Sequence, residues 1–280
     1  MSTVAVATCA VRDVDPDSPA LLAALADEGV AAELAAWDDP EVDWGRYDLV
    51  VVRSTWDYTD RRDAFLAWAR SVPRIANAYP VLEYSSDKHY LAHLASRGVS
   101  VVPSTFCDVG DAPAFPDRDF VVKPCVGAGA IGAERYGADE LDAARAHVAR
   151  LHGAGRDVLI QPYVASVDDW GERALVFIDG AFSHALTKGA LLNVVEVERH
   201  GLYRQELMSR ASAEPDALVA AATAIVASGF DDLTYARVDL VELAGEWALI
   251  ELELVEPSLF LAYDDVAAVR LARAIARRAT

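Results

Sequence analysis

The chain has 280 residues, 53% of them hydrophobic, which is enough to bury a large core and to form two or three subdomains. It carries 44 acidic against 25 basic side chains, and a net charge of −19 disfavours binding to nucleic acid or to an anionic membrane surface. Its three cysteines form neither a disulfide framework nor a zinc-binding spacing. The sequence shows no signal-peptide pattern and no apolar run of transmembrane length, so we expect a cytoplasmic protein without nucleic-acid or membrane partners.

The first 84 residues alternate between strand and helix patterns. Apolar, β-branched runs predict strands at 3–9, 31–37 and 47–53, and apolar residues at helical spacing predict helices over 19–28 and 64–70. This alternation indicates a parallel sheet flanked by helices, in which ligands bind beyond the carboxyl ends of the strands. Directly beyond the third strand lie Ser54, Thr55, Trp56, Asp57 and Tyr58. They offer hydroxyls, a carboxylate and two aromatic rings to a small substrate; the alternative is a loop that packs its tryptophan onto the core.

Only three of the basic residues are lysines: Lys88, Lys123 and Lys188. A compact ammonium group suits a phosphate-binding site for which a planar guanidinium has the wrong shape, so the three lysines can mark such sites. The alternative is that the scarcity of lysine is chance. Lys88 lies in the first turn of a helix predicted over 86–97. Its charge there opposes the helix dipole, which favours a role in anion binding over one in helix stability.

A glycine-rich segment, CVGAGAIG at 125–132, directly follows Lys123 and its short predicted strand, 120–124. Gly127, Gly129 and their small neighbours allow backbone N–H groups to approach phosphates closely. The segment lacks the Gly-Lys-Ser/Thr ending of a P-loop and the close helix of a dinucleotide-binding motif. Its position after a strand and a lysine is what makes it a candidate for phosphate binding.

The rest of the chain contains helical patterns over 139–151, 215–228 and 266–278 and strand patterns over 158–164, 172–177 and 181–187. Pro162 places the first of these strands at an edge or its terminus, and Asp179-Gly180 predicts a hairpin between the other two. The segment 193–207 has no clean period. It is either a loop that closes over a substrate, with Arg199 or Arg204 on a carboxylate, or a solvated surface loop.

A second hairpin is predicted within 235–257, around an Ala-Gly-Glu turn. The two-residue period of a strand places Arg237 and Asp239 on the same face of the first strand, and Glu251 and Glu253 on the same face of the second. Folding at the turn then brings Asp239 opposite Glu251. Like charges that face each other across strands are destabilising, and a divalent cation with oxygen ligands removes that repulsion. The alternative is a solvated face whose carboxylates are neutralised by Arg237 and water.

In this order, the parts resemble the ATP-grasp superfamily of carboxylate–amine ligases. The resemblance runs from about Lys88 to Pro257 and includes VVKP with the glycine-rich segment, QPYV at 161–164, GER at 171–173 and the acidic hairpin. It implies an α/β (α+β) protein with the ATP-grasp fold: an N-terminal parallel-sheet domain and two α+β lobes that clasp ATP. The expected segments are 1–84 (N-terminal domain with the substrate loop), 85–119 (linker helix and strand), 120–163 (lid lobe) and 164–280 (C-terminal lobe with the acidic hairpin).

The resemblance also implies roles for individual residues. The nucleotide-binding residues would be Lys88, Lys123, Gly127, Gly129, Gln161, Tyr163, Val164 and Glu172. The ligands of Mg²⁺, or of Mn²⁺ in its place, would be Asp239, Glu251 and Glu253. The catalytic residues would be Arg237 and Lys188. The substrate-binding residues would be Ser54, Thr55, Trp56, Asp57, Tyr58, Arg199 and Arg204. Many relatives carry asparagine where this chain has Glu253, and a second metal ion would offset the added charge.

More narrowly, RSTWDY at 53–58, SHA at 183–185 with Lys188-Gly189, and Glu256-Pro257 resemble a bacterial branch that includes cycloserine-forming O-ureido-serine cyclo-ligases. This implies an ADP-forming ligase of antibiotic biosynthesis that activates the carboxylate of an amino-acid-like small molecule and closes a C–N bond within it. The alternatives are an intermolecular ligase of the glutathione-synthetase or ribosomal-protein-modification type, and an ATP-binding module without catalysis. Homodimers are usual among such relatives, so a homodimer is a further expectation.

Overall fold

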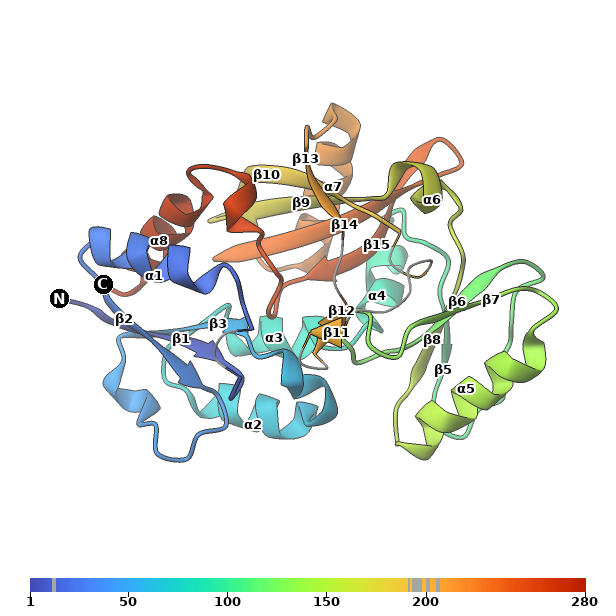
Figure 1. Ribbon diagram of the computed structural model, residues 1–280, viewed down its shortest axis with the longest axis horizontal. Coiled ribbons are helices and arrows are strands. Elements are labelled where there is room, and N and C mark those ends of the chain that lie inside the picture. Colours follow the sequence, from blue (N-terminus) through green and yellow to red (C-terminus); the bar gives the residue numbers. More distant parts are fainter. Residues whose placement is uncertain (12–13, 191, 193–197, 200–201, 205–206) are drawn as a thin grey trace.

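The computed structural model describes residues 1–11, 14–190, 192, 198–199, 202–204 and 207–280. Three sheets follow one another along the longest axis of the molecule, a parallel sheet at one end, an antiparallel sheet in the middle and a second antiparallel sheet at the other end (Figure 1). Both chain termini lie beside the parallel sheet (Figure 1). This mixture of helices with parallel and antiparallel sheets confirms the predicted fold class.

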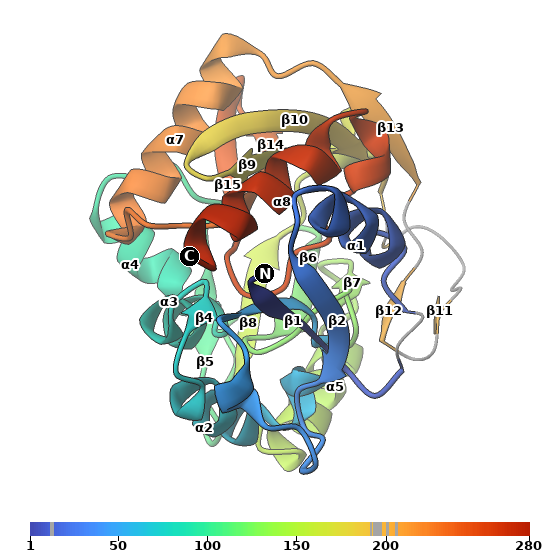
Figure 2. The same ribbon diagram turned by 90° about the vertical axis from the view of Figure 1, so that its left-hand side faces the viewer.

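The parallel sheet has the strand order β2 (Ala31–Ala36), β1 (Thr3–Thr8), β3 (Leu49–Ser54) and β4 (Ile75–Ala76). Helices α1 (Ser18–Asp27) and α8 (Ala267–Arg278) pack on one face, and α2 (Arg62–Ser71) and α3 (Tyr79–Ser85) lie on the other (Figure 2). The central strands are buried on both faces, which explains why their sequences are continuously apolar. The last helix of the chain therefore packs beside the first one. Two short 3-10 helices, Trp44–Arg46 and Trp56–Asp60, lie before and after β3.

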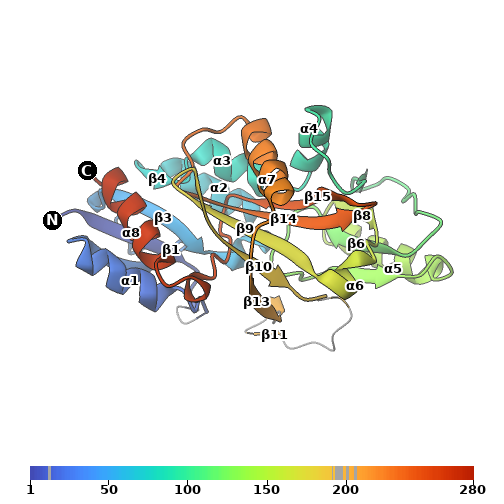
Figure 3. The ribbon, with the colours of Figure 1, turned by 90° about the horizontal axis from the view of Figure 1, so that it is seen from above.

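The central sheet is antiparallel, in the order β13 (Met208–Ala211), β10 (Ala181–Lys188), β9 (Glu172–Ile178), β14 (Tyr235–Leu243) and β15 (Glu246–Glu253). Both predicted hairpins are present, and each turn has two residues with positive φ: Asp179-Gly180 and Ala244-Gly245. Asp239 pairs with Glu251, as predicted, and Arg237 pairs with Glu253. Helices α4 (Tyr90–Ser96) and α7 (Pro215–Ser228) cover one face of this sheet (Figure 3).

The third sheet is antiparallel, in the order β5 (Thr105–Cys107), β8 (Val158–Pro162), β6 (Phe120–Pro124) and β7 (Glu134–Tyr136), and α5 (Leu141–Gly153) covers it. Pro162 is the last residue of β8, as its missing N–H requires. The glycine-rich segment joins β6 to β7 and turns through Gly129, Ala130 and Gly132, all with positive φ. From β8 the chain returns to the central sheet through α6 (Ser166–Trp170).

One local prediction is wrong. The helix predicted over 86–97 begins only at Tyr90. The reason is Asp87, whose Oδ1 accepts the N–H of His89 at 3.0 Å and so turns the backbone before the helix starts. Lys88 lies in that turn, not in the first helical turn, so the helix dipole does not explain its position.

The segment 193–207 lies largely outside the described residues. Within it, Arg199 ends the two-residue strand β11 (Glu198–Arg199) and Arg204 ends its antiparallel partner β12 (Tyr203–Arg204). The side chains of Arg199 and Arg204 are not among the described parts, so their substrate role stays a prediction. Nowhere in the described ranges is a helix both long and apolar enough to cross a membrane.

Gly171 is the glycine at which a close backbone approach leaves no room for a side chain. Its φ is +69°, and an added Cβ would lie 2.3 Å from the carbonyl oxygen of Lys188. We expect Gly171→Ala to lower the free energy of unfolding by about 1–3 kcal/mol, measured by denaturant unfolding. Gly153→Ala in α5, where an added Cβ meets nothing within 4 Å, is the control and is expected to be neutral or mildly stabilising. Equal losses in the two variants would contradict this explanation.

Candidate active site

A cavity of about 610 Å³ lies where the three sheets meet. Trp56 and Tyr58 reach it from the parallel-sheet domain, Lys123 from the third sheet, and Arg237 and Glu251 from the central sheet. The sequence-predicted residues that line it are Trp56, Tyr58, Lys88, Lys123, Gly127, Gly129, Gln161, Tyr163, Val164, Glu172, Lys188, Arg237, Glu251 and Glu253. The cavity therefore brings together residues that are up to about 200 positions apart in the chain.

At the base of the cavity lies a buried ion cluster. Both oxygens of Asp239 accept from the guanidinium of Arg237, at 2.9 and 3.0 Å, and Lys188 Nζ lies 2.9 Å from Oδ2. Lys188 Nζ also lies 3.1 Å from Glu172 Oε2. Burial would raise the pKa of Asp239, but the two cations outweigh it and hold the pKa at about 2. Asp239 is thus a fixed anion that orients Arg237 and Lys188.

The other two predicted metal ligands are paired as well. Glu251 Oε1 lies 2.9 Å from Lys88 Nζ, and Glu253 forms an ion pair with Arg237. Burial would raise the pKa of Glu251, but Lys88 and Lys123 outweigh it and lower that pKa. For Glu253, burial and the nearby carboxylates of Glu251 and Asp239 outweigh Arg237 and raise the pKa to about 7. The two glutamates on one strand face therefore have different proton affinities.

Oxygen ligands of this kind fit Mg²⁺. Glu251 and Glu253 line the cavity and their side chains are each 25% exposed, so both can turn towards an ion. Asp239 is only 1% exposed, does not line the cavity and has both oxygens occupied by Arg237 and Lys188. A cation would thus meet the two glutamates first, and Asp239 as a ligand stays a prediction.

Lys88 and Lys123 both line the cavity with the glycine-rich segment, but they differ in their contacts. Lys88 Nζ donates to the carbonyl oxygen of Gly127 at 2.8 Å as well as to Glu251. Lys123 makes no hydrogen bond or ion pair with any described residue, and burial lowers its pKa. Lys123 is half-buried and forms no ion pair with a described residue, so its ammonium group is available to an anionic ligand.

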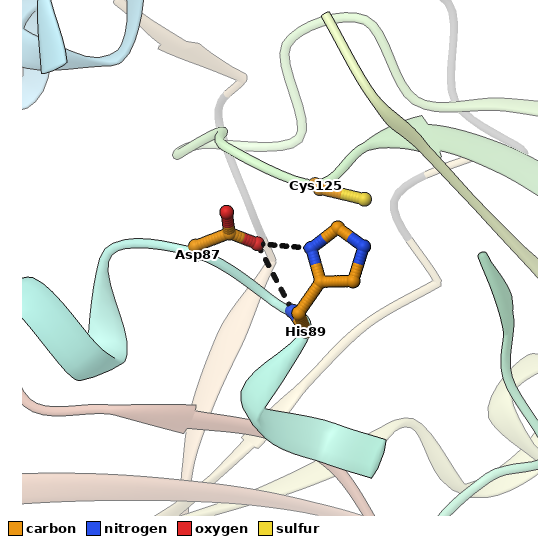
Figure 4. A group of neighbouring side chains, drawn as sticks. All are labelled: Asp87, His89 and Cys125. Carbon is orange, nitrogen blue, oxygen red and sulfur yellow. Dashed lines mark hydrogen bonds and ion pairs between the residues drawn. The ribbon is translucent and has the colours of Figure 1, made fainter. Parts of the chain in front are cut away.

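Asp87 and His89, the chain neighbours of Lys88, lie close to Cys125 (Figure 4). Asp87 Oδ1 lies 2.7 Å from His89 Nδ1, and the N–H of Lys88 donates to the carbonyl of Cys125 at 2.9 Å. Among the described residues these three form the one group whose potential ligand atoms all lie within 4.8 Å of one another. Burial raises the pKa of the Cys125 thiol, which keeps it protonated and makes it a poor metal ligand. We interpret the group as a structural link between α4 and β6.

The predicted adenine-binding stretch follows β8. The N–H of Tyr163 donates to Asp119 O at 2.7 Å, and Gln161 Nε2 donates to Ser104 Oγ at 2.9 Å. The N–H of Val164 has no hydrogen-bond partner among the described residues, and it is a ready donor for a ring nitrogen. Sequence reasoning missed the apolar wall beside this stretch: Val102, Val167 and Ile250 pack in one cluster with Val164, and Val121 pairs with Gln161 across the sheet.

The predicted substrate loop divides into two groups. Trp56 and Tyr58 line the cavity. Ser54, Thr55 and Asp57 do not: Ser54 and Thr55 are buried, and Asp57 accepts from Trp37 Nε1 at 2.8 Å and pairs with Arg61. The substrate role of these three stays a prediction, and the structure gives them contacts within the N-terminal domain.

Sequence reasoning also missed part of the cavity lining, which comes from three segments. The missed residues are Asp15, Asp17, Ser85, Ser86, Glu256, Ser258, Phe260 and Tyr263. The two aspartates follow the carboxyl end of β1, the position at which parallel sheets bind ligands, so that rule could have found them. The two serines lie at the end of α3. The other four follow β15 and line the cavity only because the chain then turns back towards the parallel sheet.

The comparisons with known proteins agree along the whole chain. The chain is 40% identical to the cycloserine biosynthesis protein DcsG of Streptomyces lavendulae, over 99% of both sequences. The protein belongs to the DcsG family. Residues 4–79 match the model of the N-terminal domain of D-cycloserine synthetase DcsG. The crystal structure of D-cycloserine synthetase DcsG superposes with a TM-score of 0.89 at 38% identity, covering 100% of both chains.

More distant structures share the ATP-grasp ligase fold. A D-alanine–D-alanine ligase from Bacillus anthracis superposes with a TM-score of 0.68 at 14% identity, over 100% of this chain and 97% of that one. A RimK-domain ATP-grasp protein from Sphaerobacter thermophilus gives 0.69 at 15% identity, over 98% and 99%. These matches confirm the predicted ATP-grasp fold for this DcsG-family protein.

The pKa of Glu256 predicts how stability depends on pH. Burial and the charge of Glu253 raise this pKa from 4.5 to about 8, so the folded state keeps a proton that the unfolded chain releases. The free energy of unfolding therefore falls as pH rises between these values and levels off above them. Glu256→Gln removes this contribution, so the variant gains stability relative to the wild type over the same range.

Denaturant unfolding of the metal-free protein at about pH 5 and about pH 8 measures this difference. Glu246→Gln on the exposed start of β15 is the matched control and should leave the pH dependence as in the wild type. A difference between wild type and Glu256→Gln that is the same at both pH values would contradict the prediction.

Proposed function

We propose that this DcsG-family protein is an ATP-dependent, ADP-forming ligase that closes a ring within one amino-acid-like molecule, converting an O-ureido-serine-type substrate to a cycloserine-type product. The observation that carries the proposal is the cavity itself, which is lined by the glycine-rich segment, two accessible glutamates and Lys123, a lysine without an ion pair among the described residues. The similarity to a cycloserine biosynthesis protein supports the choice of substrate.

In this proposal ATP lies between the third sheet and the central sheet. Adenine occupies the apolar wall next to Val164 and Gln161, and Glu172 binds the ribose. Lys88, Lys123 and the backbone of Gly127–Gly132 hold the phosphates, because ammonium groups and backbone N–H groups are their natural partners. Glu251 and Glu253, with Asp239, would hold one or two Mg²⁺ ions, which supply neutralisation of the phosphate charge.

A carboxylate does not react with an amine, because its oxygen is a poor leaving group, and phosphorylation by ATP converts that oxygen into phosphate, a good one. A carboxylate oxygen of the substrate attacks the γ-phosphorus of ATP, ADP leaves, and the carboxylate becomes an acylphosphate. The ureido nitrogen next to the oxygen then attacks the carbonyl carbon, loses its proton and expels phosphate, which forms the C–N bond of the ring. Water then cleaves the carbamoyl group from that nitrogen, which takes up a proton, and the released carbamic acid breaks down to carbon dioxide and ammonia. Arg237, fixed by Asp239, neutralises the negative charge that develops on the phosphoryl group and on the tetrahedral intermediate. Lys188 supports it from the same cluster.

The enclosed position of the site favours a small substrate. Trp56 and Tyr58 line the cavity on the side of the parallel sheet, and a cavity of about 610 Å³ suits a small-molecule substrate. Exclusion of water protects the acylphosphate from hydrolysis. A cytoplasmic location and a homodimer remain parts of the proposal.

Glu251→Gln tests the metal role. The amide keeps the shape but removes the charge, so we expect turnover to fall by at least about 100-fold while the protein still folds. Glu246→Gln on the same strand is the matched control, because Glu246 is exposed and outside the cavity. Initial rates of ADP release and far-UV circular dichroism give the two readouts. Wild-type activity of Glu251→Gln would contradict the assignment.

The function as a whole is tested by ADP release and mass analysis with Mg²⁺, ATP and O-ureido-serine. ADP formed with this compound alone, together with a cyclic product, is the expected result. ADP formed only after a second amine is added would instead indicate an intermolecular ligase. ATP binding without ADP release from O-ureido-serine would contradict the proposed substrate.

A further inference from the structure

Six acidic residues line the cavity: Asp15, Asp17, Glu172, Glu251, Glu253 and Glu256. Three of them pair with cations, Glu172 with Lys188, Glu251 with Lys88 and Glu253 with Arg237. Asp15 accepts from Ser18 Oγ and the N–H of Asp17, and Asp17 accepts from the N–H of Leu261 and lies 4.0 Å from Arg53. Within the described residues, the side chain of Glu256 is the one that has neither an ion pair nor a hydrogen bond.

The backbone at Glu256 and Pro257 is fixed by hydrogen bonds from the N-terminal domain. The residue is only 8% exposed, and its side chain lines the cavity. Its carbonyl oxygen accepts from Trp56 Nε1 at 2.9 Å, and Arg53 donates to the next carbonyl, that of Pro257, at 3.0 Å. Two side chains of the N-terminal domain therefore fix the backbone at this point of the cavity wall, and the carboxyl group of Glu256 forms no ion pair with a cation among the described residues.

The carboxyl group of Glu256 is buried without a partner, and a ligand that brings a positive charge next to it would stabilise its ionised form. Three of the cations that line the cavity already form ion pairs with other acidic residues: Lys88, Lys188 and Arg237. Lys123 belongs to the phosphate end, next to the glycine-rich segment. The ligand at Glu256 must therefore bring its own positive charge.

We propose that Glu256 is the residue that binds the α-ammonium group of the amino-acid substrate and thereby selects it. This inference rests on the proposed function, since it concerns the substrate of the same site. It also gives the substrate an orientation. Arg237 donates to the carbonyl of Ser258 at 3.0 Å, two residues from Glu256, so the wall that bears Glu256 adjoins the guanidinium assigned to the reacting carboxylate. The ammonium and carboxylate of one amino acid, which share a carbon atom, would lie at Glu256 and near Arg237.

The test compares O-ureido-serine with its analogue that lacks the α-amino group. In the wild type, loss of the ammonium leaves Glu256 unpaired, and we expect kcat/KM to fall by about 100-fold or more. In Glu256→Gln, kcat/KM for O-ureido-serine falls, while the two compounds differ by less than about 5-fold. The KM for ATP stays near its wild-type value, because Glu256 forms no ion pair or hydrogen bond with the described residues that we assign to ATP. Glu256→Asp keeps the charge at a shorter reach and is expected to retain part of the discrimination.

Each other outcome has a distinct meaning. If the wild type releases no ADP with either compound, the proposed function fails before this inference is reached. If the wild type discriminates between the compounds and Glu256→Gln discriminates equally well, the inference is wrong and the proposed function stands. A variant that loses the same factor with both compounds has a structural defect, which also overturns the inference. A raised Mg²⁺ requirement with unchanged discrimination would assign Glu256 to a metal instead.

Discussion

The cavity depends on one buried charge, the carboxylate of Asp239. Removing a carboxylate from water is expensive, and the cost is offset only because Arg237 holds both its oxygens and Lys188 contacts one of them. Asp239 and Arg237 lie on β14 and Lys188 on β10, with β9 between them. The cluster therefore requires all three strands in register. Once fixed, Arg237 has donors left for Glu253 and for the carbonyl of Ser258, so the same interaction also shapes the wall beyond the hairpin.

A second constraint joins the parallel-sheet domain to the central sheet. Asn77 donates to the carbonyls of Tyr235 and Leu254 and accepts from the N–H of Thr234, and Tyr235 donates its hydroxyl hydrogen towards the carbonyls of Val52 and Val255. All these groups are buried, so each lost hydrogen bond would leave a polar atom without water. This network places the carboxyl ends of β1 and β3 against the end of β15. The N-terminal domain thus forms one side of the cavity, and the DcsG family model matches that domain.

The net charge of −19 does not conflict with a site for ATP. All three lysines of the chain line the cavity, and the field that a phosphate experiences is set by charges within a few ångströms, not by the whole surface. Most of the charged side chains that line the cavity form ion pairs with one another, so their charges nearly cancel. Two side chains that line the cavity stay unpaired among the described residues, the base Lys123 and the acid Glu256. Such an arrangement suits two ligands, an anionic nucleotide and a substrate with a positive group.

The sequence by itself determined the elements with a clear period and the hairpins with a glycine turn, because these depend on neighbours along the chain. The register of Asp239 with Glu251 and the end of α7 at Gly229 follow from such local rules. The order of lysines, glycines and acids was enough to indicate the ATP-grasp fold. Only the tertiary structure decided that Lys88 lies in a turn and that Asp57 accepts a hydrogen bond from Trp37. It also decided that Glu256 lines the cavity and has no side-chain partner among the described residues. Those outcomes depend on contacts between residues up to about 200 positions apart, and no local pattern encodes them.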